Sequence, residues 1–144
     1  MRFRVILRVI GLLVMVFSLS ILPPIIVSLI YHDGELDSFL YAMAINLLCG
    51  FALWFPVRKN RGELKIRDGF LITVLFWTVL GLFGSVPFFL ASQPDLSFTD
   101  ALFESVSGLT TTGATILTGI DNLPKSILLY RQLLTWLGGM GIIV

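Results

Sequence analysis

The chain has 144 residues, of which 56% belong to the apolar set AVILMFWYC and only 13% are charged. A typical soluble domain carries about 25% charged residues, and a soluble chain of this size cannot bury so much apolar surface. The mean hydropathy of +0.94 indicates that lipid is the solvent for much of the surface. We therefore expect an all-α integral membrane protein.

Charge and cysteine content exclude several other classes of protein. Ten Lys and Arg residues nearly balance nine Asp and Glu residues, for a net charge of +1, whereas nucleic-acid binders concentrate positive charge on one face. Cys49 is the single cysteine, so we expect neither a disulfide framework nor a cysteine metal site. The sequence has no H-E-x-x-H motif, no paired carboxylates within an apolar run and no Ser–His pairing. We expect no catalytic residues, no cofactor and no nucleic-acid partner.

The first uncharged run covers residues 9–31 and is long enough to cross a bilayer. As a helix rising about 1.5 Å per residue it would reach about 34 Å, against a hydrocarbon core of about 30 Å. Pro23-Pro24 should kink or interrupt this helix. The basic residues Arg2, Arg4 and Arg8 are also compatible with a cleaved signal peptide, but the run exceeds the usual length of about 7–15 residues and no A-x-A-like site ends it.

Two further runs, residues 39–57 and 69–94, are also long enough to span the bilayer. Acidic residues follow the first run, and basic residues separate the second run from the third. The acidic residues are Asp33, Glu35 and Asp37, and the basic residues are Arg58, Lys59, Arg61, Lys65 and Arg67. By the positive-inside rule, the N-terminus and the 58–68 loop are cytoplasmic and the 31–38 loop is external.

Residues 95–121 are too polar for a spanning helix and too apolar for a free loop. Ser97 followed by Asp100 fits a capping box at a helix start. Apolar residues then recur at helical spacing, at Phe98, Leu102, Val106 and Leu109. A helix over 98–108 would rise only about 16 Å, half of the bilayer core, and Gly108 is the expected C-terminal stop.

A hydroxyl-rich segment, Thr110-Thr111-Thr112-Gly113-Ala114-Thr115, follows this short helix. Irregular backbone at membrane depth requires surrounding protein or a water-filled path, so the pattern is typical of a re-entrant pore helix and loop. The last apolar segment, residues 126–144, has no basic residue after Arg131, whereas this end should emerge on the cytoplasmic side. We therefore expect the chain to be cut off inside its fourth spanning helix.

The loop has the composition of an ion-selectivity filter, in which backbone carbonyls replace the hydration shell of a cation. Gly113 permits the backbone conformations that aim successive carbonyls at one axis. We expect Thr110, Thr111, Thr112, Gly113 and Ala114 to line the filter, and oxygen-only ligation suits a hard cation. A polar connecting loop is the alternative. A phosphate-binding loop of the form G-x-x-x-x-G-K-[ST] is excluded because Ala114 replaces the lysine and no strand precedes it.

Acidic residues flank the loop on its expected external side. Glu104 and Asp121 are candidate vestibule acids that would concentrate incoming cations, and ordinary solvated charges are the alternative. Asp95 lies in the same region, whereas Asp100 is better explained as part of the helix cap. Arg131 should reach toward the outer headgroups unless a partner such as Asp121 holds it inside the protein.

Small and polar residues in the spanning segments have simpler explanations. Gly138-Gly139-Met140-Gly141 should permit close helix contact, with a bend or gate as the alternative. Gly81 and Ser85 have the same small-x-x-x-small spacing and the same packing explanation. Asn46 should form a hydrogen bond with a neighbouring helix.

Two segments, Ser107-Gly-Leu-Thr-Thr-Thr-Gly-Ala-Thr115 and Gln132-Leu-Leu-Thr-Trp-Leu-Gly-Gly-Met-Gly-Ile-Ile-Val144, resemble the first pore repeat of the Trk/Ktr/HKT superfamily of K⁺ transporters. The similarity is greatest to the N-terminal part of its TrkH-like branch. The resemblance implies four helix–pore loop–helix repeats around one axis, with K⁺ held by the carbonyls of Thr111, Thr112 and Gly113. Residues 1–60 would then be a two-helix N-terminal unit and residues 61–144 the first repeat, truncated in its second helix.

The resemblance also implies partners and a location. Members of this branch are multi-pass proteins of the bacterial inner membrane, form homodimers and work with a cytoplasmic nucleotide-binding subunit of the TrkA type. The chain would contribute one filter strand to a K⁺ pore completed by the remaining repeats. Two other interpretations remain open: a small subunit that assembles as a homotetramer around a pore, and a structural membrane subunit that conducts nothing.

Overall fold

A computed structural model describes residues 3–32, 34–59, 61–91, 96–117 and 120–143, and all regular structure within these ranges is helical. The first predicted span is two helices, α1 (Phe3–Leu19) and α2 (Leu22–Tyr31). They are separated just before Pro23-Pro24, because proline lacks the N–H that a continuous helix needs. The expected interruption is therefore confirmed.

The second span is α3 (Leu36–Trp54), extended by the 3₁₀ turn η1 (Phe55–Val57). The third predicted span is also divided, into α4 (Ile66–Gly84) and α5 (Val86–Leu90), with the break at Ser85. Pro87 follows this break and lies in the first turn of α5, where its missing N–H costs no hydrogen bond. Both broken spans thus have a proline at the start of their second helix.

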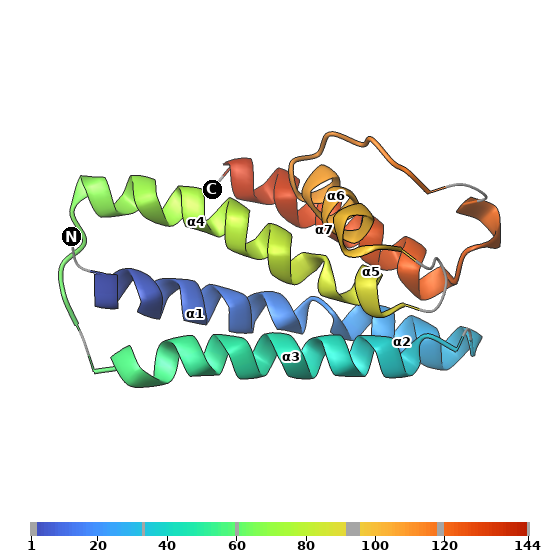
Figure 1. The fold of residues 1–144 in the computed structure, drawn as a ribbon, viewed down its shortest axis with the longest axis horizontal. Coiled ribbons are helices and arrows are strands. Elements are labelled where there is room, and N and C mark those ends of the chain that lie inside the picture. The colour runs from blue at the N-terminus through green and yellow to red at the C-terminus, as the bar shows by residue number, and fades with distance from the viewer. Residues whose placement is uncertain (1–2, 33, 60, 92–95, 118–119, 144) are drawn as a thin grey trace.

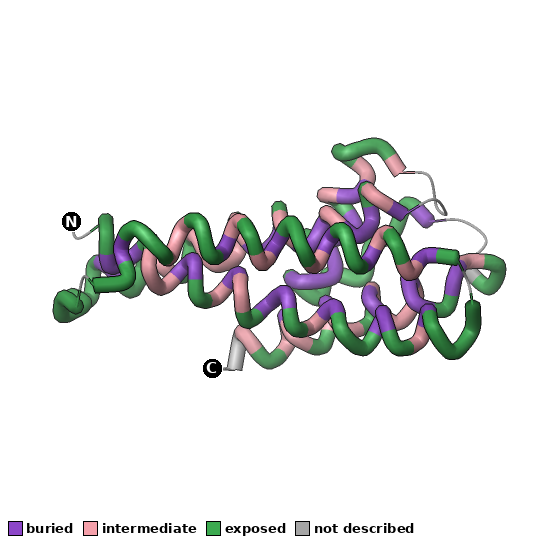
Figure 2. Tube along the Cα trace, turned by 90° about the horizontal axis from the view of Figure 1, so that it is seen from below, coloured by how far each residue is buried: buried purple, intermediate pink, exposed green. Residues whose placement is uncertain are grey.

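The first three spans form an elongated bundle in which α1 lies between α3 and α4, antiparallel to α3 and parallel to α4 (Figure 1). One side of α1 supplies much of the core, through Ile6, Ile10, Val14 and Phe17. Buried and exposed positions alternate along the helices, with the buried sides facing the interior (Figure 2). The pairing of α1 with α3 is close because Gly11 and Gly50 face each other: a Cβ at Gly50 would lie 3.0 Å from the Gly11 carbonyl oxygen.

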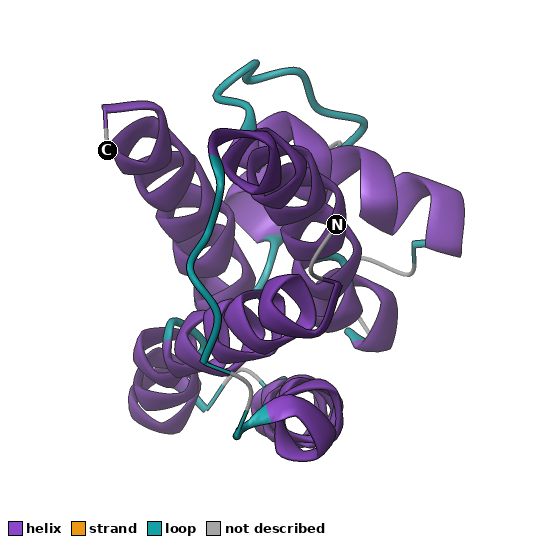
Figure 3. Ribbon diagram, turned by 90° about the vertical axis from the view of Figure 1, so that its left-hand side faces the viewer, coloured by secondary structure: helices purple, strands orange, loops and turns teal. Residues whose placement is uncertain are grey.

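The remaining elements are α6 (Phe98–Leu109), the 3₁₀ turn η2 (Ile120–Asn122) and α7 (Lys125–Ile143). Viewed along the bundle, the long helices are seen nearly end-on and lie side by side, and loops connect their ends (Figure 3). Helix α7 packs against α2 and α6. Tyr130 anchors it, because its hydroxyl donates to the Gly84 carbonyl oxygen at 2.6 Å and its ring packs edge-on against Phe39 and Phe88.

Three helical stretches among the described residues are long and apolar enough to cross a membrane: Phe3–Tyr31, Leu36–Val57 and Ile66–Leu90. Large apolar side chains remain exposed along α3 and α4, among them Tyr41, Leu48, Phe70 and Val74. Such surface is compatible with lipid or with more protein, and not with water. Helix α7 is as long as α3 and less apolar.

Candidate functional site

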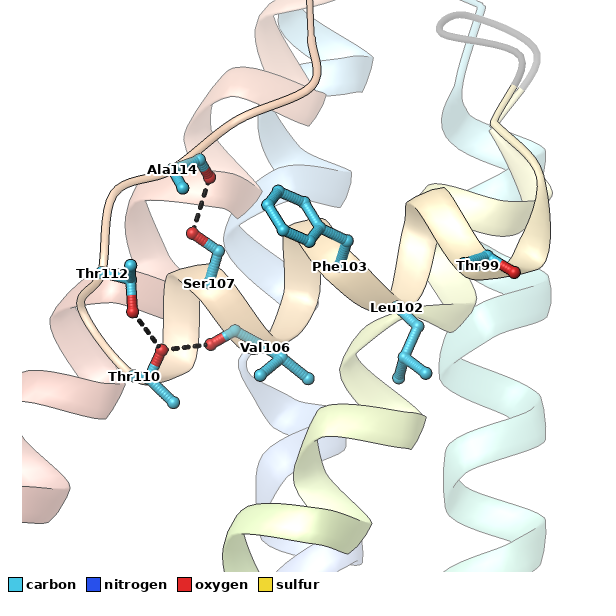
Figure 4. A pocket seen from close by; sticks show the side chains of 8 residues that line it. All are labelled: Thr99, Leu102, Phe103, Val106, Ser107, Thr110, Thr112 and Ala114. Atoms are coloured by element: carbon cyan, nitrogen blue, oxygen red, sulfur yellow. Dashed lines mark hydrogen bonds between the residues drawn. The ribbon is translucent and has the colours of Figure 1, made fainter.

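The candidate site is built on the short helix α6, which crosses the direction of the long helices (Figure 4). It begins at the expected residue, with the Ser97 hydroxyl accepting a hydrogen bond from the Asp100 backbone N–H at 3.3 Å, which is one of the two hydrogen bonds of the predicted capping box. Its 12 residues rise about 18 Å. The Ser105 hydroxyl ties it to α4 by donating to the Gly81 carbonyl oxygen at 2.8 Å. The predicted half-length helix is therefore present.

The end of α6 differs from the prediction. Gly108 does not stop the helix; it lies inside the last turn, where a Cβ would come within 3.1 Å of Leu134 on α7. The chain turns two residues beyond Leu109, with Thr111 at φ 55°. The Thr111 N–H bonds the Gly108 carbonyl and the Thr112 N–H bonds the Ser107 carbonyl, each at 3.0 Å. This is the Schellman pattern, with threonine in the left-handed position that glycine normally occupies.

A second left-handed residue follows, because Gly113 has φ 78°. No atom lies within 4 Å of the position that a Cβ at Gly113 would occupy, so conformation and not lack of space explains the glycine. Within residues 110–114 the sign of φ is positive only at Thr111 and Gly113. The side chains of this segment are exposed, and the hydroxyls of Thr110 and Thr112 lie 2.7 Å apart.

After Gly113 the chain runs back along α6 and is tied to it at consecutive residues. The Ser107 hydroxyl donates to the Ala114 carbonyl oxygen at 2.6 Å (Figure 4). The Glu104 carboxylate Oε1 accepts from the Thr115 hydroxyl at 2.5 Å and from the Ile116 N–H at 2.7 Å. The role of Ser107 as a support of the loop was not predicted from the sequence. The three-residue spacing of Glu104 and Ser107 could have indicated it, because this spacing puts both side chains on one side of α6.

Arg131 of α7 completes the set of Glu104 contacts, with its Nε 3.3 Å from Glu104 Oε2. The Glu104 side chain is 1% exposed and the Arg131 side chain 16% exposed. Glu104 was expected to face an open vestibule, and its carboxylate is instead buried. Arg131 was expected to reach the headgroups or pair with Asp121; its partner is Glu104, because α6 crosses α7 next to it. Asp121 is exposed in η2, and Asp95 lies outside the described residues.

Gly138 of α7 serves packing beneath the loop. A Cβ at Gly138 would overlap the carbonyl group of Leu109, at the end of α6. Gly139 faces the Thr111 methyl group, and Gly141 faces the rings of Phe76 and Trp77. The packing interpretation therefore holds for Gly138, whereas at Gly139 and Gly141 the nearest atoms lie at ordinary van der Waals distances and a Cβ would fit.

A largely apolar groove of about 370 Å³ lies between α6 and the loop. Its lining, drawn in Figure 4, consists of Thr99, Leu102, Phe103, Val106, Ser107, Thr110, Thr112 and Ala114. Among the described residues no three His, Cys, Asp or Glu side chains come together. The oxygen atoms that the loop presents are therefore backbone carbonyls and threonine hydroxyls, which suit a hard, weakly hydrated cation.

Comparison with known proteins gives matches over the whole chain. A family model described as TrkH, cation transport protein, matches residues 36–144. The Trk system potassium uptake protein TrkH of Vibrio parahaemolyticus is 57% identical over 144 residues, which are 100% of this chain and 30% of that protein. TrkH of Escherichia coli K12 is also 57% identical with the same coverage, and TrkG of that strain is 41% identical over 98% of this chain and 29% of its own length.

A solved structure agrees with these sequence matches. The crystal structure of the potassium transporter TrkH from Vibrio parahaemolyticus superimposes with a TM-score of 0.94 at 57% identity, and the match covers 99% of this chain and 31% of that one. The chain thus spans about a third of the length of the relatives that it matches.

Proposed function

We propose, because the chain belongs to the TrkH family of cation transport proteins, that residues 110–114 form one strand of a selectivity filter in a K⁺ uptake pore. The family is one of membrane transporters and not of enzymes. Relatives that match the entire chain are named potassium uptake proteins, which supports K⁺ as the transported ion.

The observation that carries this proposal is the backbone of the loop. Left-handed residues at Thr111 and Gly113 alternate with residues of negative φ. The segment therefore follows neither a helix nor a regular strand, and its side chains are exposed, as suits a filter strand that binds cations through its backbone carbonyls. The Ala114 carbonyl already accepts the Ser107 hydroxyl. The carbonyls of Thr111, Thr112 and Gly113 are therefore the proposed K⁺ ligands, and Thr110 and Ala114 flank them.

One strand cannot surround an ion, so the proposal includes further filter strands from additional repeats. Relatives about three times as long support a protein in which residues 1–60 form a two-helix N-terminal unit and residues 61–144 belong to the first repeat. We place the N-terminus on the cytoplasmic side of a bacterial inner membrane, since basic residues fill the 58–68 loop. The proposed assembly is a homodimer that works with a TrkA-like cytoplasmic subunit. Exposed Asp121 would lie near the outer entrance of the pore.

The proposal predicts that Gly113→Ser lowers the preference for K⁺ over Na⁺. A left-handed conformation costs a residue with a Cβ about 1–2 kcal/mol, and relief of that strain would turn or displace the adjacent carbonyls. A change of ~1.4 kcal/mol alters relative binding about tenfold. We expect the ratio of K⁺ to Na⁺ uptake into proteoliposomes, measured on the full-length protein that carries this segment, to fall by about that factor.

Gly34→Ser is a matched control for this experiment. Gly34 has φ 81° and, like Gly113, no atom within 4 Å of an added Cβ; it lies in the turn between α2 and α3, away from the loop. Both substitutions add the same atoms to the same kind of backbone, and only Gly113→Ser should change selectivity. An inserted, folded Gly113→Ser protein with unchanged K⁺/Na⁺ uptake would contradict a filter role for this loop.

A further inference from the structure

The Glu104 carboxylate joins three parts of the molecule. It belongs to α6, its Oε1 accepts two hydrogen bonds from Thr115 and Ile116 of the returning loop, and its Oε2 faces Arg131 of α7. We call these four residues the carboxylate node. The two oxygens hold different segments, since Oε1 fixes the chain just after the proposed filter strand and Oε2 fixes the neighbouring helix.

Because the Glu104 carboxylate is buried, its charge must be compensated by other parts of the protein. At 1% exposure the carboxylate has little water to solvate it, and a buried charge is tolerated only when it is paired and hydrogen-bonded. Here the donors come from the loop and from α7, so the charge is compensated only when the loop and α7 are both in place. The two hydrogen bonds to Glu104 Oε1 therefore favour one particular position of residues 115 and 116.

The node also lies where it can affect the strand. Thr115 is two residues after Gly113, and the hydroxyl of Ser107, one turn along α6 from Glu104, holds the intervening Ala114 carbonyl. At the start of the strand, the Thr111 and Thr112 N–H groups bond the last turn of α6. The strand is thus fixed at both ends, and its far end depends on Glu104.

We propose that Glu104, held by Arg131, is a positioning residue that sets the ion selectivity of the loop by fixing the far end of the filter strand. This inference rests on the proposed function and adds to it a dependence on a buried ion pair outside the TTTGA segment. Glu104 touches no ion in this role; it acts through Thr115 and Ile116.

The test uses the full-length protein in proteoliposomes, with separate measurements of K⁺ and Na⁺ uptake and of thermal stability. Glu104→Gln keeps the size of the side chain and removes the charge that holds Arg131. The double variant Glu104→Leu/Arg131→Met removes both charges and the acceptor of Thr115 and Ile116, and replacing a whole buried pair is often tolerated where breaking it is not. The double variant therefore remains informative if the single variant folds poorly.

We expect both variants to reduce the K⁺/Na⁺ uptake ratio about tenfold, a factor that corresponds to ~1.4 kcal/mol, while Na⁺ uptake remains measurable. Asp37→Asn makes the same carboxylate-to-amide change at an exposed residue in the first turn of α3, and it should leave the ratio unchanged.

A merely structural pair would give a different pattern, with less folded protein and equal loss of uptake for both ions. A stable double variant that keeps the unmodified K⁺/Na⁺ ratio would overturn the positioning role and leave the proposed function intact. An unmodified protein without preference for K⁺ would overturn the proposed function and this inference together, so the two failures are distinguishable.

Discussion

At the scale of single residues, the loop contains two left-handed residues, Thr111 and Gly113. The sequence predicts the conformation of only one of them. Glycine is the default residue at positive φ, so Gly113 could be predicted. Thr111 could not, because a β-branched residue at positive φ is a rare outlier. Its conformation is imposed by the two hydrogen bonds that close the end of α6. Strain of this kind persists only where the surroundings enforce it.

The three glycines of α7 allow a prediction about packing at the same scale. Gly138→Ala would place a Cβ on the Leu109 carbonyl, and overpacking of this kind costs about 1–3 kcal/mol. Gly139→Ala adds the same methyl group one residue later, where the nearest atom, on Thr111, lies at an ordinary 3.8 Å. Replacing glycine by alanine inside a helix gains up to about 1 kcal/mol.

We therefore expect Gly138→Ala to lower the midpoint of thermal unfolding of the detergent-solubilised protein, and Gly139→Ala to leave it unchanged or raise it. The two variants control for each other, since they differ only in what the added methyl group meets. Equal midpoints would mean that α6 does not rest on α7 at Gly138.

At the scale of helices, run length predicted the spans and Pro23-Pro24 predicted the interruption of the first, whereas the break between α4 and α5 was not predicted. Pro23-Pro24 marks the start of α2 and Pro87 the start of α5. The sequence could not predict which helices become neighbours, because in lipid a spanning helix can be apolar on every side. The close pairing of α1 with α3 depends on Gly11 and Gly50. These residues are 39 positions apart in the sequence, and no sequence pattern indicates that they lie side by side.

Loop charge gives the topology prediction. The 58–65 connection and the start of α1 lie at one end of the bundle, and the α2–α3 turn and η2 lie at the other (Figure 1). Asp33 falls outside the described residues, so exposed Asp37 and exposed Arg61 are the better probes. In a Cys49→Ala background, an impermeant thiol reagent added to intact cells should modify cysteine placed at 37 and spare cysteine placed at 61. The reverse labelling would invert the orientation.

At the scale of the whole molecule, the site is assembled from segments far apart in the chain. The SGLTTTGAT motif and the short helix were visible in the sequence, and so were Glu104 and Arg131 as unusual charges. Their pairing across 27 positions was not predictable, because it depends on the angle at which α6 crosses α7. Sequence patterns give periods and local turns, whereas such an angle follows from packing of the complete set of side chains.

The last prediction concerns the 144-residue chain by itself. Its loop presents a single strand with exposed side chains beside an open groove of about 370 Å³. Replacing the hydration shell of K⁺ takes carbonyl oxygens from all sides of the ion, and in K⁺ channels four loops supply them. A single strand leaves the other sides to water or lipid, so the purified chain should insert into vesicles without conducting K⁺.

K⁺ flux into vesicles, measured for the isolated chain and for the full-length protein, and the symmetry of the particles decide between this outcome and the two alternatives. K⁺-selective flux from the 144-residue chain, together with particles of fourfold symmetry, would contradict the need for further repeats and favour a homotetramer, in which each copy supplies one strand. Absence of flux in the isolated chain, with K⁺-selective flux in the full-length protein, is the result that we expect. Absence of flux in both would favour a structural membrane subunit, because a filter strand that forms no pore even among its own repeats has no ion to select.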